Sequence, residues 1–107
     1  MTIFLVETYV VKPEKLADFT AYKKNLSQWI KKHPELFKEV KSCRMFAQML
    51  GGKWGGYVEM HEFENLGECE KCFNRLLQSE YTKTYQPEFL ALIVPATYSM
   101  SVWNPVE

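Results

Sequence analysis

The sequence predicts an α+β fold, a four-stranded antiparallel sheet with two helices on one of its faces. Four short segments are rich in β-branched and aromatic residues, which is typical of strands. Two longer segments, about 13 to 32 and about 66 to 81, carry apolar residues at helical spacing. The Gly-rich run GGKWGG (51–56) joins the middle two strands as a hairpin. The order β-α-β-β-α-β over residues 1–107 is that of a single split βαβ, or ferredoxin-like, domain.

The first half of the chain supplies a strand and a long helix. Residues 3–11 (IFLVETYVV) form the first predicted strand, which Lys12 and Pro13 end. Pro13 suits the first turn of a helix. This helix, over about 13 to 32, stops before Pro34, because a proline disfavours helical backbone at the residue before it. The segment PELFKEV (34–40) adds a turn or a short helix before the next strand.

The second half supplies the hairpin, another helix and the last strand. Residues 41–50 (KSCRMFAQML) and 57–63 (YVEMHEF) are strands on either side of the Gly-rich loop. Asn65 followed by Glu68 has the outline of a capping box, which predicts that the helix over about 66 to 81 begins there. We expect a further turn in PEFLAL after Pro87, and a fourth strand at residues 96–103 (ATYSMSVW).

Composition and charge indicate one globular domain with neither a nucleic-acid nor a membrane partner. The 107 residues suffice for one modest core, and 47% of them are hydrophobic. Lys plus Arg equals Asp plus Glu, at 13 each, so attraction to nucleic acid lacks electrostatic support. No segment approaches the roughly 20 apolar residues of a membrane span, and the first residues lack the pattern of a signal peptide. Three cysteines, an odd number, argue against a secreted disulfide framework and predict a cytoplasmic protein.

The faces of the predicted strands indicate a homodimer. Ile3 and Leu5 point one way from the first strand, whereas Phe4 and Val6 point the other way, and the second strand is similarly apolar on both faces. Helices on one side of the sheet leave the other face uncovered, and soluble monomers rarely expose an apolar face of that size. We therefore expect a second copy packed face to face through the sheet, as a homodimer or a higher homo-oligomer built on it.

Nearly the whole chain resembles the dimeric α/β-barrel superfamily, in which two ferredoxin-like protomers pack their sheets into a barrel. IFLVETYVVKPEKLADF resembles the opening strand and helix of its NIPSNAP-like and antibiotic-biosynthesis-monooxygenase-like branches. GGYVEMHEFENLGECEKC resembles their third strand and capped helix. The resemblance implies a pocket between the sheet and the helices of each protomer. It does not imply one reaction, because the superfamily includes oxygenases, haem-degrading enzymes, isomerases and members without a known activity.

The haem-degrading branch of that superfamily does not fit residue by residue. Its pattern has an Asn in the first strand and a Trp and a His on the second helix. Those positions fall on Glu7, near Leu76 and near Gln86, while the two histidines, His33 and His61, lie elsewhere. The resemblance therefore leaves cofactor-independent oxygenation as the enzyme alternative, and no cofactor is expected.

The pair of cysteines in ECEKCFN (68–74) raises the question of a redox or metal site. A redox CxxC motif sits at a helix N-terminus, whereas Asn65 is the predicted cap here and Cys69 lies a turn inside the helix. A zinc site usually takes four ligands, and only Cys43 remains beyond Cys69 and Cys72. Core packing is the favoured role, with a reactive thiol or a metal ligand as the alternatives.

Glu7 and His61 are the candidate catalytic residues. Glu7 interrupts an otherwise apolar strand, and a carboxylate on a covered face must be paired, hydrated or protonated. The third strand, expected beside the first, carries Glu59 and His61 on one face, and a Glu–His pair can move protons near neutral pH. The alternative is a structural role, in which Glu7 pairs with Arg44 or an edge lysine, or His61 donates to a backbone carbonyl.

The expected ligand pocket is aromatic. Its candidate lining residues lie on predicted strands and a predicted helix near the Glu–His pair. They are Tyr9, Tyr22, Trp29, Glu59 and Phe63. No metal ligand set is expected, and the phosphate-loop, dinucleotide-binding and zinc-protease motifs are missing from the sequence. Three functions stay open: binding of a small apolar or aromatic molecule, which the sequence favours, cofactor-independent oxygenation, and a structural or assembly module without a ligand.

Overall fold

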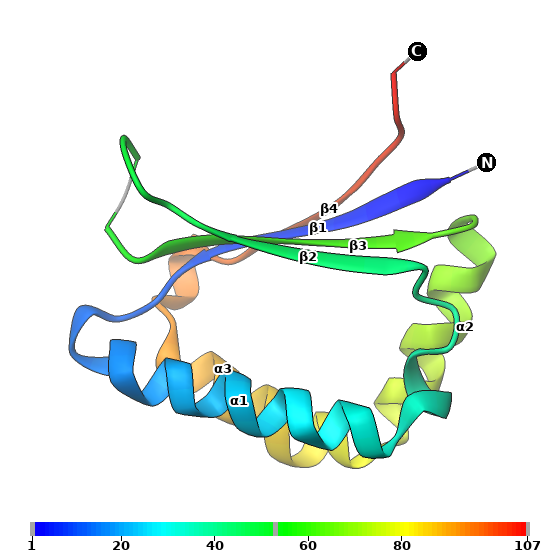
Figure 1. Ribbon diagram of the computed structural model, residues 1–107, viewed down its shortest axis with the longest axis horizontal. Helices are drawn as coiled ribbons and strands as arrows, with labels where there is room; N and C mark the ends of the chain where they lie inside the picture. Colours follow the sequence, from blue (N-terminus) through cyan, green and yellow to red (C-terminus); the bar gives the residue numbers. More distant parts are fainter. Residues whose placement is uncertain (1, 53, 107) are drawn as a thin grey trace.

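The computed structural model describes residues 2–52 and 54–106. Strands β1 (Ile3–Val10), β2 (Ser42–Ala47), β3 (Gly56–Phe63) and β4 (Ser99–Trp103) form one open antiparallel sheet in the order β2-β3-β1-β4. Helices α1 (Leu16–Lys32), α2 (Leu66–Leu77) and α3 (Gln86–Leu92) all lie on one side of this sheet (Figure 1). The predicted ferredoxin-like α+β fold is confirmed, and the sheet of one chain does not close into a barrel.

Local chemistry sets the starts of the first two helices. Pro13–Lys15 form a 3-10 turn that leads into α1, and Phe19, Tyr22 and Leu26 form the buried stripe of that helix. The side chain of Asn65 caps α2 by accepting a hydrogen bond from the backbone N–H of Glu68 at 2.9 Å. None of the helices in residues 2–52 and 54–106 has both the length and the apolar character needed to cross a membrane.

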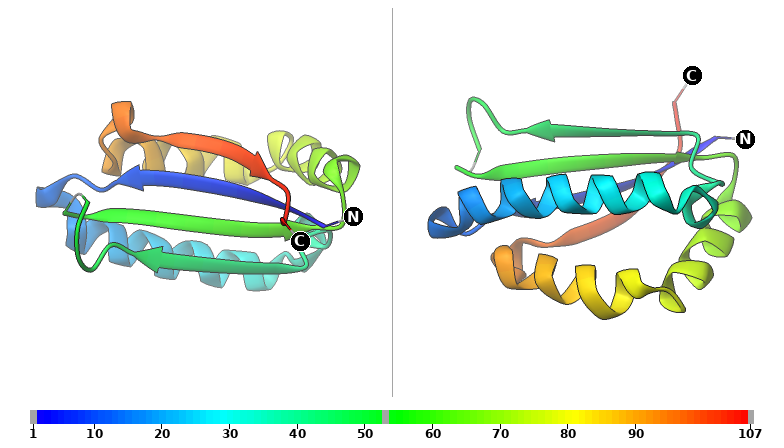
Figure 2. Two further views of the ribbon diagram at one scale, coloured as in Figure 1. Left: turned by 90° about the horizontal axis from the view of Figure 1, so that it is seen from above. Right: turned by 60° about the horizontal axis from the view of Figure 1, so that its bottom comes forward.

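The region after α2 differs from the sequence prediction. The predicted helix over 66–81 ends at Leu77, and a π-helical turn (Tyr81–Tyr85) leads into α3. The reason is that the hydroxyls of Ser79 and Thr82 both donate to the carbonyl of Leu76 at 2.8 Å, in competition with the next helical N–H. The turn expected in PEFLAL is thus part of a separate helix, which lies below β4 while α1 lies below β2 and β3 (Figure 2).

The second and fourth strands are shorter than predicted. β2 ends at Ala47, and the loop that follows contains Gly51 and Gly52 with φ of 70° and 61°, a region that favours glycine. β4 begins only at Ser99, because Pro95–Thr97 form a 3-10 turn first.

Two hydrophobic clusters fill the space between the sheet and the helices. The first packs β1 against α1 and α3, and its buried members are Tyr9, Val11, Phe19, Tyr22, Leu26, Phe89, Leu92 and Ile93. The second packs β1 and β3 against α2, and its buried members are Ile3, Leu5, Phe63, Cys69 and Cys72. Along β1, Leu5 belongs to the second cluster and Tyr9 to the first. Glu7 lies between them, so a charged residue separates the two parts of the core.

The opposite face of the sheet carries no helix (Figure 1). Phe46 on β2 and Trp103 on β4 are 50% and 55% exposed there, at the two edges of the sheet, whereas Val6 at its centre is buried. We call this helix-free surface the outer face. Its apolar residues are those against which a second copy of the chain is expected to pack.

Candidate functional site

The strand register brings three ionisable side chains together on the helix-facing side of the sheet. Glu7 on β1 lies opposite Glu59 on β3, and Leu5 lies opposite His61. Because alternate residues of a strand share a face, Glu7, Glu59 and His61 point the same way. The Nε2 atom of His61 is 3.2 Å from Oε1 of Glu7 and 3.5 Å from Oε1 of Glu59. The structure therefore places the two candidate catalytic residues in direct contact.

Each carboxylate holds a second contact through its other oxygen. The hydroxyl of Tyr98 donates to Oε2 of Glu7 at 2.6 Å. Lys23 of α1 donates to Oε2 of Glu59 at 2.8 Å, and the hydroxyl of Tyr9 donates to the same oxygen. The Oε1 atoms are left facing His61. We call these six residues the polar cluster: Glu7, Tyr9, Lys23, Glu59, His61 and Tyr98.

Burial and charge set the protonation of the polar cluster. Burial alone would raise the pKa of Glu59, but hydrogen bonds and charges from His61, Lys23 and Tyr9 lower it to about 2. Burial alone would lower the pKa of His61, but its contacts with the Cys43 thiol and the two carboxylates raise it well above the ordinary value of 6.5. These contacts favour the imidazolium form of His61 over the neutral ring. This arrangement favours holding a charge or a polar group over general-base catalysis by His61.

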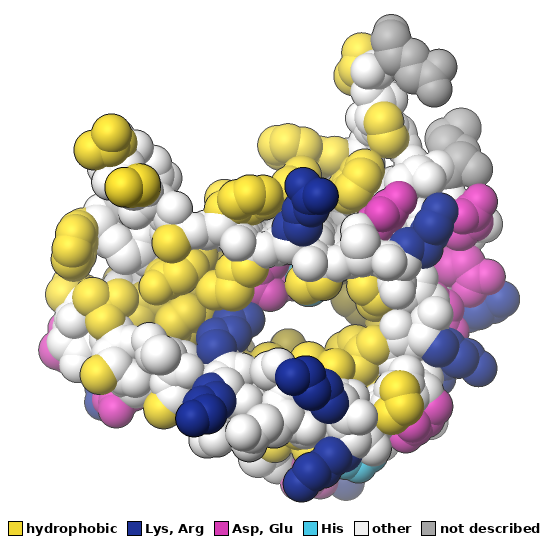
Figure 3. Space-filling model, in the orientation of Figure 1, with side chains coloured by type: hydrophobic (Ala, Val, Ile, Leu, Met, Phe, Trp, Pro, Cys, Tyr) yellow, Lys and Arg dark blue, Asp and Glu magenta, His cyan; other side chains and the backbone are white. Residues whose placement is uncertain are grey.

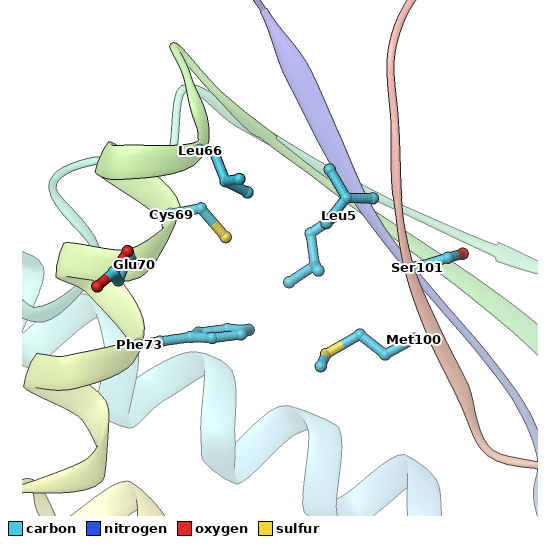
Figure 4. Close-up of a pocket in the computed structure, with 8 residues that line it drawn as sticks. Leu5, Leu66, Cys69, Glu70, Phe73, Met100 and Ser101 are labelled. Carbon is cyan, nitrogen blue, oxygen red and sulfur yellow. The ribbon is translucent and has the colours of Figure 1, made fainter.

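A hollow of about 400 Å³, open to solvent on one side, lies between α2 and the β1–β4 edge of the sheet, and we call it the cavity. Figure 4 shows Leu66, Cys69 and Phe73 of α2 and Leu5 and Met100 of the sheet pointing toward one another, while Ser101 points away. The other lining residues are Glu70 and Val102. The walls are therefore mostly apolar, as small-molecule pockets usually are.

This cavity and the polar cluster are neighbours on the helix-facing side of the sheet. Two of its lining residues, Leu5 and Met100, are the direct cross-strand partners of His61 and Glu7. Paired side chains on one face of a sheet have Cβ atoms about 5 Å apart. The hydroxyl of Tyr98 also lies 3.8 Å from Sδ of Met100. The polar cluster thus lies beside the wall that Leu5 and Met100 form, although its own residues do not line the cavity.

Two further hollows shape the molecule. The space-filling view is hollowed between the sheet and α1, with hydrophobic side chains around the opening (Figure 3). A larger hollow of about 820 Å³ lies at the β2–β3 hairpin, where its lining includes Val10, Phe46 and Val58. Most of its lining strand residues lie on the outer face, and Tyr9 is the member of the polar cluster that reaches it.

The other predicted pocket residues lie mainly in the core. Tyr22 is buried and its hydroxyl donates to the carbonyl of Tyr85 at 3.0 Å. Phe63 is buried in the cluster under α2, and the ring of Trp29 packs against that of Tyr85 at 5.0 Å. Tyr9 belongs to the polar cluster and also lines the larger hollow.

The sequence prediction missed Lys23, Tyr98 and Met100 as site residues. For Lys23 a signal was present, because it follows Phe19 by four residues and precedes Leu26 by three, on the buried stripe of α1. The positions of Tyr98 and Met100 follow from the register between β4 and β1, which no local pattern in the sequence indicates.

The cysteines of the CxxC motif are buried in the core. The thiol of Cys72 contacts the carbonyl of Leu36 at 3.5 Å, and burial raises the pKa of Cys72 to about 11 and that of Cys69 above its ordinary value. Cys43 on β2 is exposed. Among the described residues, the donor atoms close enough to share a metal ion belong to Glu7, Glu59 and His61.

Comparison with known proteins shows likeness in fold. No protein-family model and no curated protein matches the sequence. A NIPSNAP family protein from Agrobacterium tumefaciens has a TM-score of 0.78 at 12% identity, with 100% of this chain and 95% of that chain covered. An uncharacterised NIPSNAP-like domain protein from Burkholderia xenovorans has a TM-score of 0.76 at 17% identity, with 98% and 85% covered.

A third similar structure represents the other branch named above. It is a putative antibiotic biosynthesis monooxygenase from Bacteroides thetaiotaomicron, with a TM-score of 0.69 at 14% identity and coverage of 99% of this chain and 90% of that chain. The likeness to these NIPSNAP-like and monooxygenase-like structures confirms the resemblance drawn from the sequence. At such identities it establishes the fold and leaves the activity to the site.

Proposed function

We propose that the protein binds a small, flat, largely apolar molecule in the cavity between α2 and the sheet, with one polar group of that molecule directed at the polar cluster. The observation that carries this proposal is the position of the cluster. Glu7, Glu59 and His61 interrupt the core between its two hydrophobic clusters. A buried ionic group contributes less to stability than well-packed apolar residues of similar volume would. A ligand that uses those charges gives a reason for their place in the core.

The shape of the cavity supports an aromatic ligand with a hydroxyl or carbonyl group. Phe73 offers a ring face, and Leu5 and Met100 offer a flexible apolar floor. The volume of about 400 Å³ lies in the range of small-molecule pockets. A polar substituent at the Met100 end would lie beside the Tyr98 hydroxyl and the Glu7 carboxylate.

Binding is favoured here over the oxygenation alternative. A cofactor-independent oxygenase needs a group that removes a proton from its substrate near neutral pH, and the contacts that raise the pKa of His61 reduce the share of neutral ring available for that role. The structural alternative, a module without a ligand, predicts that probes of the cavity do not bind.

The test uses 2-naphthol, a flat apolar probe with one hydroxyl, and naphthalene, which lacks it. Isothermal titration calorimetry in EDTA-containing buffer should show one 2-naphthol bound per chain, with weaker binding of naphthalene. Met100→Trp should abolish binding because the larger ring occupies the cavity, whereas Val106→Trp, at a 98% exposed position, should leave it unchanged. Absence of saturable binding, or equal binding by both variants, would contradict the proposal.

We also propose that the protein is a homodimer paired through the outer face. Phe46 and Trp103 are half exposed there, and their burial against a second copy would remove apolar surface from water. Sedimentation velocity at micromolar concentration should show a dimer. Phe46→Glu should give a monomer, and Leu77→Glu, at an exposed position of α2, should not. A wild-type monomer under these conditions would refute the pairing.

A further inference from the structure

Three donor atoms converge at the centre of the polar cluster. One atom each from Glu7, Glu59 and His61 lie within 4.8 Å of one another, and His61 Nε2 is 3.2 Å and 3.5 Å from the two Oε1 atoms. Bonds of about 2.0–2.2 Å from one ion to nitrogen and oxygen ligands, at angles of about 90–110°, separate adjacent ligand atoms by about 3.0–3.5 Å. These two distances lie in the range that a single bound ion would impose, and the two Oε1 atoms lie within 4.8 Å of each other.

The same distances are long for a hydrogen-bonded ion pair. A charge-assisted N–H···O bond to a carboxylate is about 2.7–2.9 Å long. The Nε2 atom of His61 is instead shared between Glu7 and Glu59, at 3.2 Å and 3.5 Å, without a close bond to either. It faces the space between the two oxygens, where an ion would sit.

The contacts around the three donors resemble the outer shell of a metal site. Ligating carboxylates are usually held by hydrogen bonds to their other oxygen, which aims the ligating oxygen at the metal. Here Tyr98 holds Oε2 of Glu7, and Lys23 holds Oε2 of Glu59. Each Oε1 is thereby directed at His61.

We propose that Glu7, Glu59 and His61 bind one divalent cation of the first transition series, of the Mn²⁺ to Zn²⁺ type, with its remaining positions open to water or a ligand. One imidazole nitrogen suits such ions better than Mg²⁺ or Ca²⁺, which prefer oxygen ligands alone, and the absence of a thiolate among the three donors disfavours soft ions. The sequence alone does not suggest this set, because the register of β1 and β3 brings Glu7 beside two residues more than fifty positions away.

The site does not depend on the proposed apolar ligand, because the ion binds the polar cluster itself. Its competitor is the proton that His61 carries without a metal, since the two carboxylates stabilise either cation. Lys23 offsets the charge of one carboxylate.

The test uses the full chain after EDTA treatment and desalting. Titration with Mn²⁺, followed by loss of the free-ion electron paramagnetic resonance signal, and with Zn²⁺, followed by calorimetry, should each show one ion per chain. His61→Gln should weaken binding at least as much as loss of an outer contact does, which is about 10- to 100-fold. His33→Gln is the matched control, because His33 lies at the end of α1, where its Nδ1 atom is 2.9 Å from the carbonyl oxygen of Trp29 and its ring packs against the Trp29 ring.

Tyr98→Phe keeps all three donors and removes the outer hydrogen bond to Glu7, together with the weaker 3.8 Å contact of the hydroxyl with Met100. It should weaken metal binding by about 10- to 100-fold while the circular dichroism spectrum stays unchanged. The proposal is overturned if the wild type binds neither ion stoichiometrically, or if His33→Gln and His61→Gln weaken binding equally. It is also overturned if Tyr98→Phe, although folded, binds as the wild type does.

Discussion

Replacement of Lys23 tests whether the charges of the polar cluster stabilise one another. Its Nζ lies 2.8 Å from Oε2 of Glu59, and the two side chains are 25% and 11% exposed. Removal of one partner from a buried ion pair typically costs about 3–5 kcal/mol. Glu59 keeps its contacts with Tyr9 and His61, so we expect Lys23→Met to lower the free energy of unfolding by about 2 kcal/mol. Methionine retains most of the apolar stem of Lys23 and removes only the ammonium, which also lies 5.7 Å from the centroid of the Phe19 ring.

Urea denaturation in EDTA-containing buffer measures this change. Lys24→Met is the matched control, because Lys24 is the exposed neighbour on α1, and it should change stability by less than about 0.5 kcal/mol. The double variant Lys23→Met, Glu59→Gln should be less destabilised than the sum of the two single variants, because neither charge is then left without the other. Equal midpoints for Lys23→Met and Lys24→Met, or strict additivity in the double variant, would refute this account of the cluster.

Two further predictions concern the region around α2. Arg75 donates two hydrogen bonds, of 2.7 Å and 2.6 Å, to the Glu39 carboxylate, and these lower the pKa of Glu39 below 4.5. A carboxylate whose pKa is lower in the folded state than in the unfolded state stabilises the protein at pH values above its unfolded-state pKa. This stabilisation is lost as the pH falls through its folded-state pKa. Glu39→Gln should therefore flatten the loss of stability below about pH 4.5 in urea titrations, and parallel wild-type and variant curves would contradict this. Iodoacetamide should alkylate Cys43 alone in the native protein and all three cysteines in urea, since Cys69 and Cys72 are buried; fast native labelling of either would contradict their place in the core.

The order of strands and helices could be predicted because short local patterns in the sequence mark where these elements begin and end. Asn65 marks the start of α2, and the glycines of 51–56 mark the hairpin, each through chemistry confined to a few residues. The end of α2 could not be predicted from periodicity. The apolar spacing continues past Leu77, and the two hydroxyl groups that compete for the Leu76 carbonyl do not alter that spacing.

In the candidate site too, some features follow from local sequence patterns and others depend on long-range packing. Alternation along each strand places Glu7 on one face of β1 and both Glu59 and His61 on one face of β3, so their residue types already suggested a charged site. Their distances depend on the register between strands, which rests on long-range pairing. Lys23 comes from a separate layer, and its contact with Glu59 depends on how α1 lies across the sheet.

Methyl nuclear magnetic resonance with 2-naphthol tests the central claim, ligand binding beside the polar cluster, most directly. If 2-naphthol binds there, the methyl resonances of Leu5, Met100 and Val102, which line the cavity under α2, should show saturable shifts. The methyl resonances of Val10 and Val58, which line the hollow at the hairpin, should not move. Saturable shifts confined to Val10 and Val58, or no saturable shift at any of the five residues, would contradict ligand binding in the cavity under α2.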